Sequence, residues 1–198
     1  MKSIYLSPSA QENNIGVGNY GTEEERMNQL ADVIEPILKR NGMTVYRNKP
    51  SMNLREIVQD SRNKNADYHL ALHTNAYKRI SRGGEIHVHS KTSAGYTFAE
   101  HLYKTLKELT PTSDRGIKIS PQFYELYYTS APAALIEIDF HDNIESAQWL
   151  IANIVKIGEA FAYSILDYYN IDYKKEIGTV YKLKGIRTMI DNLIKELE

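Results

Sequence analysis

Two side chains that can bind a metal or transfer a proton occur where a folded sheet rarely places polar groups. His73 ends the apolar run 70–72 and precedes the polar turn 74–76, and the carboxyl end of a strand is where open α/β sheets bind their ligands. Glu137 lies inside the apolar run 133–138, where an unpaired carboxylate costs several kcal/mol. Hydrolytic zinc sites combine such ligands with a base that accepts a proton from water. The pair therefore predicts a metal-hydrolase site, with His73 as a ligand and Glu137 as the base.

Each of these residues also has a structural interpretation. His73 could be a core histidine bonded to the backbone, and Glu137 could form a buried ion pair with an arginine. The polar turn after His73 favours the functional interpretation. If both residues were only structural, the chain would carry two costly polar groups without a use.

Further metal ligands should come from the same edge of the sheet. The three glutamates 23–25 open a predicted helix, where acidic residues usually interact with the helix dipole, although one of them could face a metal. Gln11 follows the first strand, in a loop where glutamine is ordinarily solvated. His87 and His89 share one face of a strand that we expect to be half exposed. We expect these two histidines to be structural or at the surface, and the same holds for His69, His101 and His141.

Apolar periodicity predicts alternating strands and helices, which is typical of an α/β sheet covered on both faces. The resulting fold class is a mixed, largely parallel sheet of about six strands with helices on both faces, plus a C-terminal helical extension. Strands are predicted at Ile4–Leu6, Met43–Arg47, Asp67–His73, Gly84–His89, Gly116–Ile119 and Ala133–Ile138. Helices are predicted at Glu23–Arg40, Leu54–Asn63 (with Asn53 as N-cap), Thr97–Leu109 and Ile144–Tyr169.

Two other segments stand out along the chain. The loop Ser7–Thr22 has no period and is long enough to be functional. After Asn170 the composition changes, so we expect a domain over 1–170 and a linker with an amphipathic helix over 171–198. The apolar residues of Ile186–Leu197 recur at heptad spacing. This helix either docks on its own domain or forms a homo-oligomer through paired helices.

Composition narrows the classes of partner. A formal net charge of −1 gives no electrostatic reason to expect nucleic acid or an anionic membrane surface. The absence of cysteine excludes thiolate ligands and disulfides. The chain contains no run of 18 apolar residues, so we expect no membrane span. The apolar stretch within residues 1–7 is too short, and its flanks too polar, for a signal peptide. We expect synthesis in the cytoplasm without a signal peptide.

The order of short motifs resembles that of the zinc-dependent N-acetylmuramoyl-L-alanine amidases, which occur as autolysins and phage endolysins. The resemblance covers about residues 3–168 and is specific because its motifs follow one another in the family's order. The matching segments are Gly21-Thr22-Glu23-Glu24-Glu25-Arg26-Met27-Asn28, Ala66-Asp67 through His73-Thr74-Asn75-Ala76, Gly83-Gly84-Glu85-Ile86, Arg115-Gly116-Ile117-Lys118, Pro132 to Glu137, and Asp142-Asn143.

The resemblance implies roles for individual residues. Counting back from Asn28 places the metal-binding carboxylate of the helix start on Glu24, and His73 matches a second ligand. Glu137 matches the catalytic glutamate. Two further motif residues, Asn75 and Arg115, are implied to bind substrate.

The first metal ligand departs from the family pattern. The family normally has Pro-Gly-His after the first strand, whereas this chain has Ser7-Pro8-Ser9-Ala10-Gln11-Glu12. Gln11 is then the nearest substitute ligand, through an amide oxygen that is a weaker zinc donor than imidazole.

As a whole, the resemblance implies a peptidoglycan hydrolase that holds Zn²⁺ and cleaves the amide between N-acetylmuramic acid and L-alanine. Such an enzyme acts on the cell wall after lysis or export by a helper system. The alternative is a non-catalytic peptidoglycan-binding module with a degenerate metal site.

Overall fold

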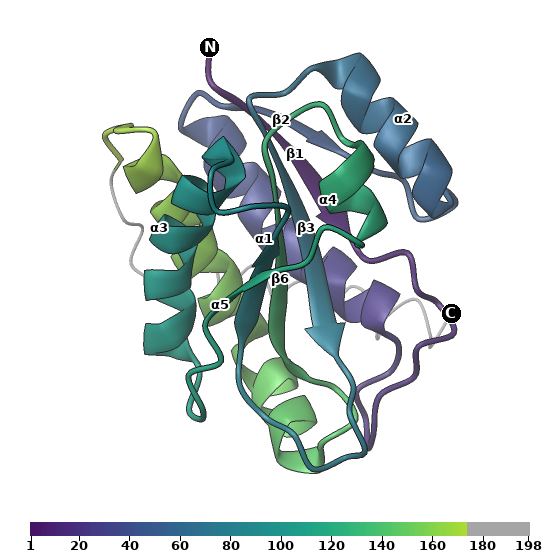
Figure 1. Cartoon of the computed structure of the whole chain (residues 1–198). Helices are drawn as coiled ribbons and strands as arrows, with labels where there is room; N and C mark the ends of the chain where they lie inside the picture. The colour runs from purple at the N-terminus through teal and green to yellow at the C-terminus, as the bar shows by residue number, and fades with distance from the viewer. Residues whose placement is uncertain (174–198) are drawn as a thin grey trace, which may run out of the picture.

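The computed structural model describes residues 1–173, and its centre is one six-stranded sheet in the order β2-β1-β3-β6-β4-β5 (Figure 1). All neighbouring strands run parallel except β4 and β6, which are antiparallel. The largely parallel sheet expected from the sequence is therefore confirmed. The strands are β1 (Ser3–Pro8), β2 (Thr44–Arg47), β3 (Tyr68–Asn75), β4 (Glu85–Val88), β5 (Ile117–Ile119) and β6 (Ala133–Phe140).

Five helices surround the sheet in this part of the chain. They are α1 (Glu23–Arg40), α2 (Leu54–Lys64), α3 (Ala94–Leu109), α4 (Tyr124–Tyr128) and α5 (Ile144–Tyr168). The N-cap predicted for α2 is confirmed, because the Asn53 side chain accepts from the backbone of Glu56 and the Glu56 side chain bonds back to the cap. The short helix α4 was not predicted. The predicted helix Ile186–Leu197 lies outside the described residues.

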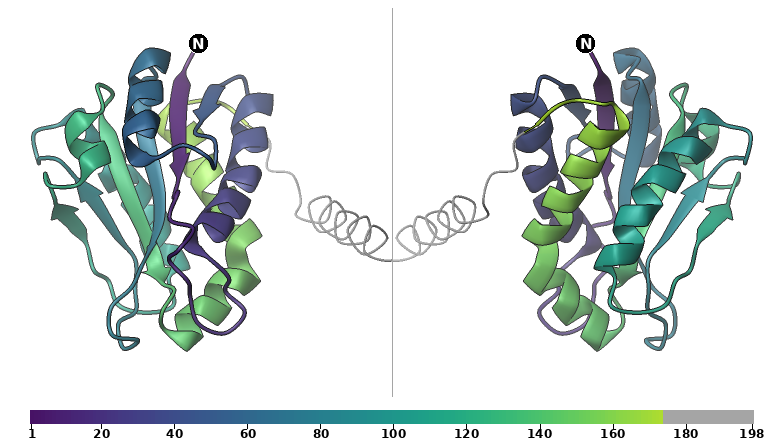
Figure 2. Two further views of the ribbon diagram at one scale, coloured as in Figure 1. Left: turned by 90° about the vertical axis from the view of Figure 1, so that its right-hand side faces the viewer. Right: turned by 90° about the vertical axis from the view of Figure 1, so that its left-hand side faces the viewer.

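Alternation along the strands gives the sheet two chemically different faces. Leu6, Leu72 and Ile136 belong to the face that packs against α1, α3 and α5 in the main apolar core. The opposite face carries polar side chains such as His69, and α2 and α4 cover it only in part (Figure 2). Helices on both faces confirm the predicted layering. The polar face is the one that can hold chemistry.

Helix α5 is long and apolar enough to cross a membrane by length and composition alone. Half of its most apolar window is buried, and the helix packs against α1 and α3. Its buried residues include Leu150, Ile157 and Phe161, which belong to the main core. This helix therefore serves as a core element of the domain.

The expectation of a half-exposed strand around His87 is wrong. All four residues of β4 are buried, because β6 pairs with one of its edges and β5 with the other. His87 is 8% exposed, and its Nδ1 lies 2.7 Å from the Ser120 hydroxyl. His89 follows the end of the strand and is half-buried.

Candidate active site

The site lies on a row of polar residues that crosses three adjacent strands near the end of β3. His73 on β3 pairs in register with Glu137 on β6, and Glu137 pairs with Glu85 on β4. Residues paired in this way project from the same face of a sheet. The register shifts between His73 and Asn75, and such an irregularity re-aims side chains at the end of a strand.

Two side chains from separate segments lie against Nδ1 of His73, and a third supports one of them. Nδ1 donates to Oε1 of Glu23 over 2.7 Å, and the side-chain amide nitrogen of Gln11 lies 3.4 Å from the same atom. Asn14 donates to the second oxygen of Glu23 over 2.5 Å. The loop after β1 and the start of α1 therefore converge on the carboxyl end of β3.

Among the glutamates at the start of α1, the structure places Glu23 rather than Glu24 against His73. Glu23 is 1% exposed and bonds His73, whereas Glu24 is half-buried. Successive residues on an α-helix point about 100° apart, so neighbouring glutamates cannot face the same point. The count back from Asn28 selected Glu24, but the amide of Asn28 donates to the Glu24 backbone carbonyl instead.

His73 is held between carboxylates. Burial alone would lower its pKa, but the carboxylates of Glu125 and Glu23 outweigh burial and raise that pKa to about 10. Burial likewise raises the pKa of Glu23, and the bond and charge of His73 more than offset this, so the pKa of Glu23 lies below its ordinary value.

The pKa of Glu137 is shifted in the direction opposite to that of Glu23. Burial raises its pKa to about 8; the charge of His73 lowers that pKa by less than burial raises it, and the charges of Glu23 and Glu85 add smaller increases. Its Oε2 is buried and has no hydrogen-bond partner among the described residues. The pKa of Glu137 is thus raised while that of its neighbour Glu23 is lowered. Such a difference between neighbouring carboxyl groups is typical of sites in which one group acts as an acid and another as a base.

Glu125 on α4 also lies at this site, although no pattern along the chain pointed to it. Oε2 of Glu125 accepts from the Ser7 hydroxyl over 2.5 Å and from His69 Nε2 over 2.7 Å. Its other oxygen lies 3.7 Å from Nε2 of His73. His69 is buried and also contacts the Ser61 hydroxyl, so its expected structural role agrees with these contacts.

The two residues implied to bind substrate, Asn75 and Arg115, are brought together by Glu85. The Asn75 amide and the Arg115 Nε each donate to one oxygen of Glu85 over 3.0 Å. Burial would raise the pKa of Glu85, but His87 and Arg115 lower it below its ordinary value. Arg115 also lies over the ring of Phe140. The charged Glu85 thus stands beside Glu137 on the same face.

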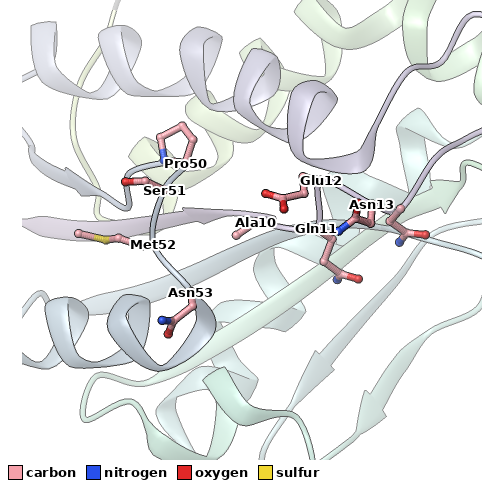
Figure 3. Close-up of a pocket in the computed structure, with 9 residues that line it drawn as sticks. Ala10, Gln11, Glu12, Asn13, Pro50, Ser51, Met52 and Asn53 are labelled. Atoms are coloured by element: carbon pink, nitrogen blue, oxygen red, sulfur yellow. The ribbon is translucent and has the colours of Figure 1, made fainter.

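A cavity of about 380 Å³ opens onto His73 and Glu137. Its remaining wall is largely apolar and includes Ile57, Phe123 and Leu135. It shares Ala10, Gln11 and Asn53 with a hollow of about 620 Å³ between the loop after β1 and the loop before α2. Figure 3 shows Glu12 and Asn13 on one side of this hollow and Ser51 and Met52 across from them. The two form one continuous depression beside the polar row.

The residues around His73 Nδ1 suit a divalent cation of the zinc type. Within residues 1–173, no three His, Asp or Glu side chains are grouped to hold a metal, so a third donor must be of another kind. Gln11 is the side chain near Nδ1 that could supply it, because rotating an amide exchanges its nitrogen and oxygen with little change of shape. An imidazole, a carboxylate and an amide oxygen then surround one point, with the amide as the weakest donor.

Comparison with known families identifies the fold and its chemistry. A family model described as N-acetylmuramoyl-L-alanine amidase, Amidase_3, matches residues 4–167. The chain belongs to this family. It is therefore a hydrolase of the N-acetylmuramoyl-L-alanine amidase class. No curated protein sequence matches the amidase.

Solved structures share the fold of this amidase at low sequence identity. The catalytic domain of CwlV from Bacillus (Paenibacillus) polymyxa var. colistinus is 22% identical and superposes with a TM-score of 0.79, covering 87% of this chain and 100% of that one. AmiC2 of Nostoc punctiforme is 21% identical with a TM-score of 0.75, over 85% and 97% of the two chains. The catalytic domain of the CD27L endolysin, which targets Clostridia difficile, is 18% identical with a TM-score of 0.69, over 84% and 98%.

Proposed function

We propose that this amidase hydrolyses the amide between the lactyl group of N-acetylmuramic acid and the L-alanine of the stem peptide, with Glu137 as the proton acceptor. The observation that carries this proposal is the free Oε2 of Glu137. It is buried, has no hydrogen-bond partner among the described residues, and belongs to a side chain that lines the same cavity as His73. A carboxylate kept without partners at such a place can accept a proton from water in the cavity.

In this proposal His73 and Glu23 hold zinc, with the Gln11 amide as third ligand. Zinc, when bound, supplies Lewis-acid polarisation of the scissile carbonyl and lowers the pKa of water. Asn14 holds Glu23 in place through its second oxygen, and partners of this kind fix ligands for a metal.

Glu137 performs the proton transfers. It takes the proton of the attacking water and returns it to the nitrogen of L-alanine as the amide breaks. Burial favours the protonated acid, and a cation held by His73 and Glu23 would favour the carboxylate. Opposing effects of this kind bring a pKa near neutral, where a group can serve first as base and then as acid.

The cavity would exclude water from the scissile amide. Its apolar wall suits the lactyl and alanine methyl groups, and the adjoining polar hollow leaves room for the rest of the substrate. Asn75 and Arg115 would bind substrate from the other side of Glu137, where Glu85 holds them in place.

The test combines metal analysis with identification of the product. Isolated walls treated with wild-type protein should release stem peptides with a free L-alanine amino group, and the protein should hold about one equivalent of zinc. His73→Ala should lose both zinc and activity while keeping its circular dichroism spectrum. Wall binding without any release of peptide would contradict the proposal and support the non-catalytic alternative.

A further inference from the structure

Glu125 is a buried carboxylate whose two oxygens have different surroundings. The residue is 4% exposed and lies on α4, which packs on β6 over the polar face. Both hydrogen bonds, from Ser7 and from His69, go to Oε2. Oε1 accepts neither of them and lies toward His73. Two donors on one oxygen fix the direction in which the other oxygen points.

The two ring nitrogens of His73 also have different surroundings. Nδ1 lies among the candidate ligands Glu23 and Gln11. Nε2 is buried and has no hydrogen-bond partner in the described chain, and Oε1 of Glu125 stands 3.7 Å away. This distance is within reach of an ion pair but longer than a hydrogen bond. A small rotation of the ring on metal binding would close it.

We propose that Glu125 is a positioning residue that turns Nε2 of His73 toward itself and so presents Nδ1 to the metal. This inference rests on the proposed function, since it concerns the same metal. A metal-binding histidine commonly donates its second N–H to a carboxylate, which fixes the tautomer and the orientation of the ring. Glu125 approaches His73 from α4, which is not one of the three strands that carry the polar row.

A purely structural role for Glu125 makes a different prediction. Through Oε2, the carboxylate links α4 to β1 and β3 whether or not a metal binds. Ser7→Ala removes one of these structural bonds, while the bond from His69 to Oε2 remains and still directs Oε1 toward His73. It is therefore the matched control for Glu125→Gln, which keeps the size and an acceptor oxygen but removes the charge.

The first experiment measures zinc affinity of full-length wild type, Glu125→Gln, Glu125→Leu and Ser7→Ala by competition with a chelator. We expect both Glu125 variants to bind zinc about 10–100-fold more weakly, the usual effect of losing such a partner. Ser7→Ala should stay within about threefold of wild type, by the same reasoning. Zinc binding by Glu125→Gln and Glu125→Leu as tight as wild type would overturn the inference.

The second experiment needs no variant and decides the matter if the Glu125 variants fail to fold. Nitrogen NMR of histidine-labelled wild type with zinc should show the His73 proton on Nε2 and the metal on Nδ1. A proton on Nδ1 would overturn the role of Glu125. If wild type binds no zinc at all, the proposed function fails as well, so the two failures are distinguishable.

Discussion

The substitution Glu137→Gln should change how the stability of the metal-free protein depends on pH. The pKa of Glu137 is raised from its ordinary 4.5 to about 8. Between these values the folded protein keeps a proton that the unfolded chain has released. This contribution to stability is therefore complete below the ordinary pKa and is lost as the pH rises toward the raised one. Glutamine cannot titrate, so the variant escapes this loss.

The size of the effect follows from the shift. With ~1.36 kcal/mol for each pKa unit, wild type should lose about 3 kcal/mol more unfolding free energy than Glu137→Gln between about pH 5 and about pH 8. Urea unfolding in the presence of a chelator, followed by the fluorescence of Trp149, measures this difference. The control is Glu85→Gln: the pKa of Glu85 is lowered, so its contribution is already present above its ordinary pKa, and this variant should lose as much stability as wild type between about pH 5 and about pH 8. Equal losses in wild type and Glu137→Gln would refute the reasoning.

Three further experiments, two with substitutions and one with a truncation, test the proposed metal ligands and the C-terminal segment. Glu23→Gln should weaken zinc binding at least about tenfold, while Glu24→Gln should leave it unchanged, because Glu23 and not Glu24 contacts His73; equal effects in a zinc titration would contradict the proposed role of Glu23. Gln11→His should tighten zinc in the same titration because imidazole is the better donor, and a Gln11→Ala protein with wild-type affinity would remove Gln11 from the ligands. A chain ending at Tyr173 tests the helix Ile186–Leu197: if that helix pairs with a second copy, sedimentation should show a dimer that becomes a monomer, and a monomer in both forms would favour docking on the domain.

Much of the fold follows from patterns that the sequence displays openly. The apolar period of α1 and the acidic start of that helix predict both of its ends as the structure has them. The capping residue Asn53 fixes the start of α2. By contrast, α4 has five residues, which is too short for any period to show. The burial of β4 depends on its neighbours in the sheet, and these are not adjacent in sequence.

Some residues of the candidate site could be predicted from the sequence and others could not. His73 and Glu137 could be predicted because each sits at an unusual place in its own strand. The choice among three consecutive glutamates could not be made, because all of them suit the first turn of a helix and only tertiary packing selects Glu23. Glu125 gave no signal, since its partners Ser7, His69 and His73 come from β1 and β3, which are far from α4 in sequence.

The most direct test of the central claim is the activity of Glu137→Gln with zinc bound. The account predicts that this variant keeps the zinc content of wild type but releases stem peptide from isolated walls about 10²–10⁴-fold more slowly, as expected when a general base is removed. Peptide release at the wild-type rate by the zinc-loaded variant would contradict the assignment of Glu137 as the base. Glu85, the neighbouring carboxylate on the same row, would then be the first residue to examine.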